Sequence, residues 1–200
     1  EEEINLEAKQ IAEKSQLVDR IEHMGKRQAF ITLKDHKENF NSNPSCRLLN
    51  PTKSELGKIS KIKLENINSK LRTELTLNQW KNSNEVIQWF KSIEEKHCCT
   101  FLQMDIKEFY PSIKEEVLTD AINFAKNTVE ISHESVQIIM HARKSLLYSD
   151  DTPWIRKDGT DTFDVTMGSF DGAEICELVG LYIISSLIKE LGISNVGLYR

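Results

Sequence analysis

The chain has 200 residues, of which 39% are hydrophobic and 28% charged, and its formal net charge is −5. This size and composition are typical of one globular domain or two small ones, and they exclude an intrinsically disordered chain. No membrane association is expected, because no apolar run approaches roughly 18 residues and the N-terminal EEEINLEAKQ lacks the features of a signal peptide. The chain begins without Met, so we expect a piece of a longer protein.

The charged residues are distributed unevenly along the chain. Residues 1–25 carry a net charge of −4, residues 26–81 one of +7 and residues 82–200 one of −8. Phosphate neutralisation requires clustered Lys and Arg, so the basic middle segment is a candidate contact surface for a polyanion. A solvated helix face accounts for the same charges equally well.

In the first half of the chain, hydrophobic spacing and turn residues predict three helices and one β-hairpin. A loosely periodic helix runs to about Met24 and is ended by Gly25. The alternating segment AFITLKDHK and the segment CRLLN form a hairpin around the polar turn ENFNSNPS. The other two helices run from about Lys58 to Leu75 and from Ser83, a candidate N-cap, to about Glu95.

The second half opens with CCTFLQMDIKEF, residues 98–109, which is short and apolar at nearly every second position and therefore predicts a buried strand. Pro111 ends this strand, and Ser112 is expected to cap a helix that runs to about Thr128. The remaining predicted elements are a helix from Ser132 to about Tyr148, a strand at TPWIRK, a helix around Ile175 that ends at Gly192, and a strand that begins in NVGLYR.

The cysteines and histidines form no metal-binding pattern. No C-x-x-C spacing joins Cys46, Cys98, Cys99 and Cys176, and none of the five histidines has a second ligand at useful spacing. We therefore expect buried, reduced thiols and an intracellular protein, either cytoplasmic or nuclear.

Asp105 is the first candidate for a chemical role. It lies in the apolar run Phe101–Ile106, where an ionised carboxylate is costly unless it is paired or bound to metal. A carboxylate at a strand end, bonded to backbone amides, is the simpler structural interpretation. Tyr110, Pro111 and Ser112 follow at once, so a strand, a carboxylate, an aromatic ring and a sharp turn occur as one unit.

This unit, FLQMDIKEFYPSI, resembles motif A of the reverse transcriptases, in which a strand carries a metal-binding Asp and an aromatic follows five residues later. Three more segments occur in the order of that family. LKDHKENFNSNPSCRLLNP is similar to the fingers hairpin, TMGSFDGAEICELVGLYI resembles motif B, and NVGLYR resembles the approach to the Tyr-x-Asp-Asp of motif C. The resemblance covers about residues 28–200.

The resemblance implies an α+β fold of the right-hand polymerase type, with fingers and palm and an antiparallel palm sheet packed on helices. Residues 1–25 would be an N-terminal helical leader, 26–96 a fingers-like region and 97–200 a palm that is incomplete at its C-terminus, before the Asp pair of motif C. The parent protein would carry out template-directed, Mg²⁺-dependent DNA synthesis from a mobile-element-type RNA template. Its partners would be an RNA template, a DNA primer and deoxynucleoside triphosphates, and this fragment itself is expected to be inactive.

The resemblance also assigns roles to individual residues. Asp105 and the backbone carbonyl of Ile106 would supply part of a two-Mg²⁺ site, and Tyr110 would be the steric gate that favours deoxynucleotides. The other assignments are Arg47 on the incoming nucleotide, Lys34 or Lys37 on its γ-phosphate, Gly168 at a close backbone approach, and Lys58, Lys61 and Lys63 along template phosphates. The alternatives are a core aromatic for Tyr110 and solvated surface charges for the lysines.

The motif B segment departs from the common Pro-Gln-Gly, since Thr166-Met167-Gly168 stands there, which leaves the usual Gln contact without a counterpart. Asp171 and Glu174 are interpreted as first-turn acids favoured by the helix dipole. Two other functions stay open. One is an RNA-dependent RNA polymerase, against which Tyr110 speaks, and the other is a non-catalytic, domesticated palm domain that binds nucleic acid.

Overall fold

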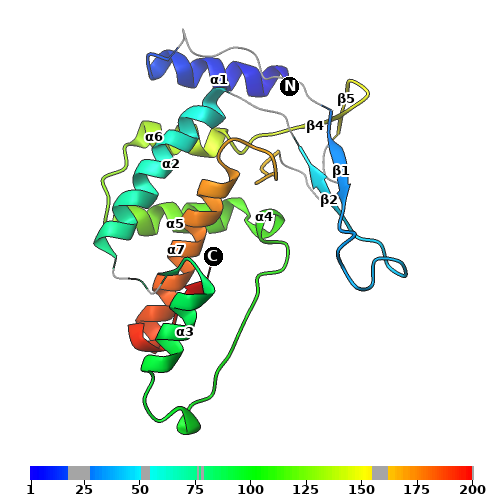
Figure 1. Cartoon of the computed structure of the whole chain (residues 1–200). Helices are drawn as coiled ribbons and strands as arrows, with labels where there is room; N and C mark the ends of the chain where they lie inside the picture. The colour runs from blue at the N-terminus through cyan, green and yellow to red at the C-terminus, as the bar shows by residue number, and fades with distance from the viewer. Residues whose placement is uncertain (18–27, 51–54, 76, 78, 155–161, 200) are drawn as a thin grey trace.

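The computed structural model describes residues 1–17, 28–50, 55–75, 77, 79–154 and 162–199. The described residues form a mixed α+β fold with seven α-helices and three two-stranded sheets (Figure 1). The α+β class predicted from the sequence is therefore confirmed. The described strands pair as three separate sheets, so a continuous antiparallel palm sheet is not present among them.

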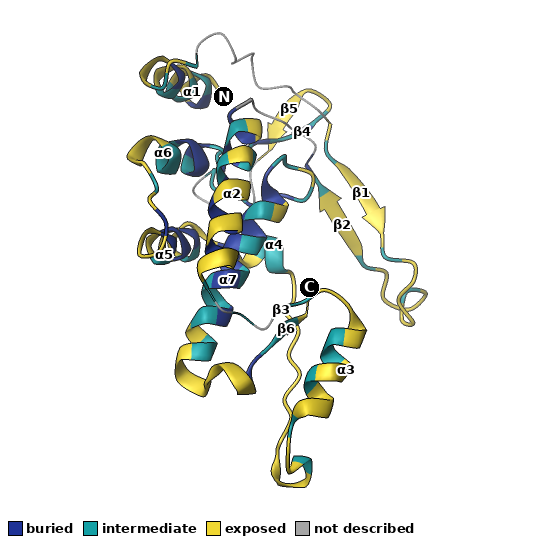
Figure 2. Ribbon diagram, turned by 60° about the vertical axis from the view of Figure 1, so that its left-hand side comes forward, coloured by how far each residue is buried: buried dark blue, intermediate teal, exposed yellow. Residues whose placement is uncertain are grey.

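Four helices enclose the main hydrophobic core, and Figure 2 shows the buried positions where these helices face one another. α7 (Gly172–Leu191) packs against both α2 (Glu55–Glu74) and α5 (Glu115–Lys126), and α6 (His133–His141) covers α2. Because α7 is covered on two sides, it is apolar around much of its circumference. Its buried side chains include Ile175, Cys176, Leu178, Val179, Leu181 and Ile184.

Two β-hairpins lie beside this helical core. β1 (Phe30–Leu33) and β2 (Cys46–Leu49) are antiparallel, as the sequence predicted, and so are β4 (Leu147–Ser149) and β5 (Thr152–Trp154). The amide of Ala29 donates a 2.8 Å hydrogen bond to the carbonyl of Tyr148, which ties the first hairpin to the second. The first hairpin is thus anchored at its open end.

The third sheet joins two segments that are far apart in the sequence. β3 (Gln79–Trp80) pairs in parallel with β6 (Leu198–Tyr199), and α3 (Ser83–Ser92) follows β3 directly. The Trp89 indole donates to the Ser194 carbonyl at 3.2 Å, beyond the C-terminal end of α7. A short helical turn, η3 (Ile193–Asn195), makes this connection after Gly192 ends α7 as predicted.

The N-terminal helix α1 (Glu2–Lys14) packs against α6. Its Ile4 forms a small buried cluster with Leu146 and Tyr148. The helix ends earlier than the predicted Met24, and residues 18–25 of that prediction lie outside the described residues.

The predicted buried strand at 98–109 is wrong. Residues 96–98 form a short turn, η2 (Lys96–Cys98), and residues 99–108 are irregular and exposed. A strand requires a hydrogen-bonded neighbour and a surface that covers one face, and no described strand pairs with this segment. Glu108 then adopts a left-handed conformation (φ +53°) and turns the chain into α4 (Phe109–Ser112).

Three other boundaries differ from the prediction. The Ser112 hydroxyl donates to the Phe109 carbonyl at 2.7 Å, and α5 begins after Lys114, so Ser112 does not cap it. α6 opens at Ser132 as predicted but ends at His141, and residues 147–149, at the end of the predicted helix, pair as β4. Asn82, and not Ser83, is the N-cap of α3, where its side chain accepts from the Glu85 amide. Of TPWIRK, residues 155–157 lie outside the described residues.

Candidate functional site

Three segments distant in sequence meet beside the N-terminal end of α7 (Figure 1). The amide of Asn50, which follows β2, donates to the carbonyl of Met167 at 3.1 Å. A Cβ added to Gly172, the first residue of α7, would lie 3.1 Å from Cε1 of Tyr110 in α4. The end of the hairpin, the 109–112 turn and the 166–171 turn therefore form one locality.

Residues 166–171 form the connecting turn at the centre of this locality. Gly168 has a φ of +103°, a conformation that side chains disfavour, so glycine suits this position. The Ser169 hydroxyl donates to the Thr166 carbonyl at 3.0 Å and closes the turn from inside. Gly168 itself is exposed, which leaves its backbone accessible.

Asn50 fixes the hairpin against this turn. Its buried side chain donates from Nδ2 to the Leu146 carbonyl at 3.1 Å, while its backbone amide binds Met167. Sequence reasoning missed Asn50, since an Asn before a Pro is a common turn signal and its partner lies 96 residues away.

The hairpin register places two of the predicted binding residues on one face. Arg47 is paired with Thr32, and the Lys34 amide continues the ladder by donating to the Ser45 carbonyl at 2.9 Å. Directly paired residues share a face and alternate residues return to it, so Lys34 and Arg47 lie on the same side of the hairpin. Lys37 belongs to the connecting loop, and the geometry therefore favours Lys34 as the companion of Arg47.

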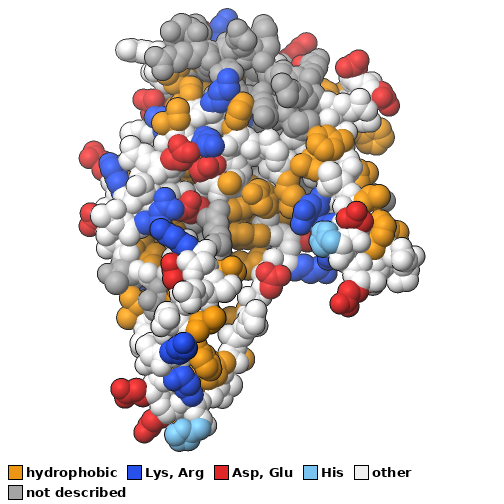
Figure 3. Space-filling view, in the orientation of Figure 1, with side chains coloured by type: hydrophobic (Ala, Val, Ile, Leu, Met, Phe, Trp, Pro, Cys, Tyr) orange, Lys and Arg blue, Asp and Glu red, His pale blue; other side chains and the backbone are white. Residues whose placement is uncertain are grey.

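The space-filling view shows how this side of the molecule is shaped. In Figure 3 hydrophobic side chains line a recess between the helical body and the hairpin, and basic side chains border it on the hairpin side. An apolar floor with a cationic rim is suited to a ligand that combines a flat ring with phosphate groups.

Tyr110 is partly buried and packs against the main core beside Phe109. One side of its ring faces the start of α7 at Gly172. Both interpretations made from the sequence, a packing aromatic and a residue that limits space beside the 166–171 turn, are compatible with this position.

Asp105 and Ile106 are not part of a buried strand, which corrects the expectation from the sequence. Both are exposed, and the irregular segment that carries them leads into α4. Within the described residues no group of three or more His, Cys, Asp or Glu side chains is placed to hold a metal ion. The described residues therefore do not fit a two-Mg²⁺ site.

The three lysines proposed to follow template phosphates lie in different surroundings. Lys58 lies 5.4 Å from the ring centroid of Phe170, at the 166–171 turn. Lys61 forms ion pairs with Glu65 and with Glu174, at 3.8 and 3.7 Å. Residues two apart on a helix do not face the same way, so Lys63 points elsewhere.

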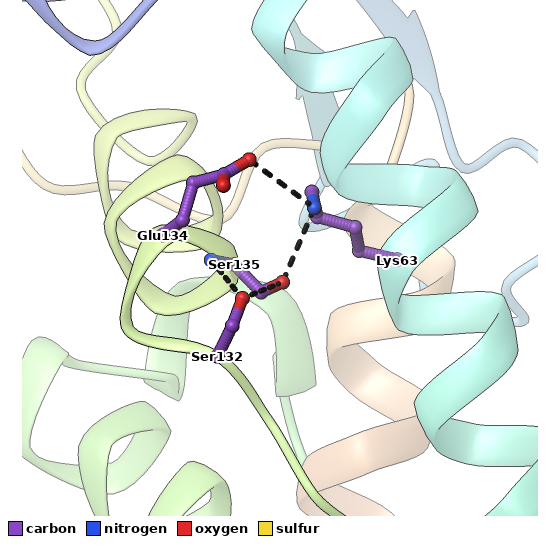
Figure 4. Close-up of polar contacts among 4 residues, drawn as sticks. All are labelled: Lys63, Ser132, Glu134 and Ser135. Atoms are coloured by element: carbon purple, nitrogen blue, oxygen red, sulfur yellow. Dashed lines mark hydrogen bonds and ion pairs between the residues drawn. The ribbon is translucent and has the colours of Figure 1, made fainter. Parts of the chain in front are cut away.

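Figure 4 shows the surroundings of Lys63 at the N-terminal end of α6. Its Nζ lies 3.8 Å from Glu134 and donates to Ser135 Oγ at 3.2 Å, while Ser132 caps the helix by accepting from the Ser135 amide. Lys63 therefore joins α2 to α6, whereas Lys58 lies at the candidate site.

A buried ionic network supports the site from beneath. Arg143 and Asp171 are each about 1% exposed and form a salt bridge, and the Ser60 hydroxyl of α2 donates to the same carboxylate. Asp171 was interpreted as a first-turn acid, and it does precede α7, but its side chain makes no cap hydrogen bond. Arg143 lies in the turn after α6, between His141 and Lys144, so no local sequence signal set it apart from these neighbours.

A second polar cluster lies between α1 and α6, away from the site. Glu7, His141 and Lys144 line a pocket of about 290 Å³ together with Gln137, Met140 and Phe163. Burial lowers the pKa of His141, although the Glu7 carboxylate 3.6 Å away and the Ile4 carbonyl oppose the shift. A hydrogen bond from Lys144 lowers the pKa of Glu7.

The cysteines differ from expectation. Cys46, Cys98 and Cys99 are exposed, and Cys176 is the buried thiol; all four are free. The exposure of Cys98 and Cys99 follows from the missing strand at 98–109.

Comparisons with known protein families, with curated proteins and with solved structures found no match to this chain. No helix in the described ranges is both long and apolar enough to cross a bilayer.

Proposed function

We propose that this chain is the fingers and palm region of a reverse-transcriptase-type polymerase and that it binds an RNA template, a DNA primer and a deoxynucleotide. The observation that carries the proposal is the convergence of three segments at the start of α7. The segments that resemble the fingers hairpin, motif A and motif B are brought together by the Asn50–Met167 hydrogen bond and the Tyr110–Gly172 contact.

The shared face of Lys34 and Arg47 supports a role in nucleotide binding. A guanidinium stacks on flat rings and donates in a planar fork, and an ammonium is a compact partner for phosphate oxygens. The 166–171 turn supports the same role, because the exposed backbone of Gly168 permits the close approach of a ligand.

Tyr110 would select the sugar in this proposal. Its ring is held between the core and the start of α7, so it cannot withdraw easily from a ligand at the 166–171 turn. A fixed ring beside the ribose would leave no room for a 2′-hydroxyl.

Catalysis in this proposal depends on carboxylates in addition to Asp105. Two-metal phosphoryl transfer needs several acidic ligands around a pair of cations, which the described residues do not assemble. The role proposed for the 200 residues alone is therefore binding, without primer extension.

A non-catalytic nucleic-acid-binding domain is the second candidate function, and the exposure of Asp105 favours it. The codons after Arg200 in the gene distinguish the two. An Asp pair there supports the polymerase, and in the full-length product Asp105→Ala should then lower primer extension by at least ~10³-fold. Activity within tenfold of the parent would make Asp105 a structural residue.

The binding role is tested on the 200-residue chain by fluorescence anisotropy with a labelled RNA–DNA hybrid at several salt concentrations. Lys34→Gln/Arg47→Gln should weaken binding and lower the salt slope by about 1–2, because each phosphate contact contributes about 0.9 to that slope. Lys126→Gln/Lys189→Gln is the matched control, since it removes the same charge from exposed positions of α5 and α7. Equal losses from both pairs would contradict the proposed interface.

Reversing Lys58, Lys61 and Lys63 together to Glu would perturb the fold as well as the proposed surface. Lys61 and Lys63 pair with carboxylates of the protein, so reversal at these positions would set like charges against each other. Lys58→Gln alone avoids this problem. It should weaken hybrid binding, because it removes a positive charge beside Phe170 in the 166–171 turn.

A further inference from the structure

We propose that Arg143 is a positioning residue, whose function is to hold the 166–171 turn, and with it Gly168, in the geometry that binds the ligand. The binding role of the turn rests on the proposed function. The positioning of the turn by Arg143 rests on the contacts of Arg143 with Asp164 and Asp171 and does not depend on that function.

Arg143 holds both ends of the connection that contains the turn. Its backbone carbonyl accepts a 2.9 Å hydrogen bond from the Asp164 amide, and its guanidinium binds the Asp171 carboxylate. Arg143 thereby fixes this connection at both of its ends. One end is where the chain leaves the β-bridge to residues 143–145, and the other is where it enters α7. The Asn50–Met167 hydrogen bond restrains the middle of the same segment.

The energetics indicate a role other than overall stability. The guanidinium is fully buried, and its Nε and Nη1 have no hydrogen-bond partner among the described residues. A buried ion pair generally stabilises a fold no better than apolar side chains of similar volume, and unpaired donors make it less favourable. A planar guanidinium that donates to one carboxylate oxygen does, however, fix the direction in which that carboxylate points, whereas an apolar contact does not.

Position distinguishes this network from the other ion pairs of the helical core. Arg72–Glu177 joins α2 to α7 at an exposed site, and Lys61–Glu174 does so close to solvent. Arg143–Asp171 is the described pair whose acidic member is the last residue of the turn. Loss of the Arg143 guanidinium would release the segment at Asp171, while the hydrogen bond from the Asp164 amide to the Arg143 carbonyl would remain.

The test compares wild-type chain with Ser60→Ala/Arg143→Met/Asp171→Leu, which removes all three polar groups together and leaves no buried charge. Hydrogen–deuterium exchange should show residues 165–171 exchanging about tenfold faster or more, while the midpoint of urea unfolding is unchanged or higher. Hybrid binding, measured by anisotropy, should weaken in parallel. Unchanged exchange in the turn, or equal acceleration in α2, α6 and α7, would overturn the positioning role.

Arg143→Lys keeps the test decisive if the triple variant fails to fold. Lysine retains the charge opposite Asp171 without the planar fork, so exchange in the turn should lie between the wild-type and fully released rates. Wild-type exchange in this variant would overturn the proposal. The readout is independent of ligand, so a wild-type chain that binds no hybrid would refute the proposed function and leave this result intact.

Discussion

Tyr110 lies against Gly172 so closely that a methyl group on that glycine would be 3.1 Å from the Tyr110 ring. Sixty-two residues separate the two in sequence, and their contact joins α4 to the first turn of α7. The absence of a side chain at residue 172 is therefore what permits the 109–112 turn to approach the 166–171 turn.

Gly172→Ala should destabilise the fold and displace the 166–171 turn. The new methyl group would lie 2.9 Å from the Thr166 carbonyl oxygen and 2.7 Å from Ser169 Oγ, both closer than van der Waals contact allows. Overpacking of this kind should lower the free energy of unfolding by about 1–3 kcal/mol. Urea titration of the variant and the wild type measures this difference.

Gly180→Ala is the matched control for that substitution. Gly180 lies in the middle of the same helix, and nothing lies within 4 Å of an added Cβ. Alanine should raise the unfolding free energy by about 0.5–1 kcal/mol because it restricts the unfolded chain. Equal effects at both positions would show that residue 172 tolerates a side chain.

Acidification should loosen the docking of α1 on α6. His141 has a lowered pKa when folded, so the unfolded chain binds more protons, and this stability is complete above pH 6.5 and lost as the pH falls below it. Glu7 has a pKa lowered from 4.5, so its contribution is lost at still lower pH. Both shifts act in the same direction, and unfolding free energies measured from pH 8 to 4 should decline.

His141→Gln isolates the histidine contribution to that decline. The variant should show a flatter pH dependence between pH 7 and 5, whereas His133→Gln, at an exposed position of the same helix, should follow the wild type. A wild-type slope in His141→Gln would assign the decline to groups other than His141.

Local signals in the sequence predicted much of this fold. The Ser132 cap, the glycine after Leu191 and the spacing of apolar residues in α2 and α7 each act within one or two turns of helix, so they can be read directly. The hairpin could be predicted because its two strands are close in sequence and separated by turn residues.

The candidate site could be predicted only in part. Segments were identified, but the contacts that unite them, Asn50 to Met167 and Arg143 to Asp171, depend on how the helices pack. The burial of Asp105 was predicted wrongly. The alternation of apolar residues around it suggested a buried strand, but no described strand pairs with this segment. Periodicity describes the segment, whereas burial depends on its partners.

Gly197→Ala should disrupt the parallel pairing of β3 with β6. An added Cβ would lie 2.0 Å from the Trp80 ring, so the indole must leave its place over the glycine. The tilted contact between the Trp80 and Trp89 rings, with centroids 4.9 Å apart, would change with it. Tryptophan emission should shift toward longer wavelength, and an unchanged spectrum would contradict this packing.

Tyr110→Ala tests the proposed choice of sugar in a full-length product that extends primers. Removal of the ring should raise the ratio of kcat/KM for a ribonucleotide to that for the matching deoxynucleotide. Tyr110→Phe keeps the ring against Gly172 and should leave the ratio near that of the wild type. An unchanged ratio in a folded Tyr110→Ala variant would identify Tyr110 as a packing residue.

We expect the irregular segment before α4 to influence self-association of the protein. Leu102 and Met104 are 83% and 78% exposed, next to Phe101 and Ile106, and apolar side chains gathered in this way promote self-association. The net charge of −5 opposes such association through repulsion, which salt screens. Higher salt should therefore favour oligomers while it weakens phosphate contacts, and sedimentation velocity at each salt concentration would separate the two effects in a binding titration.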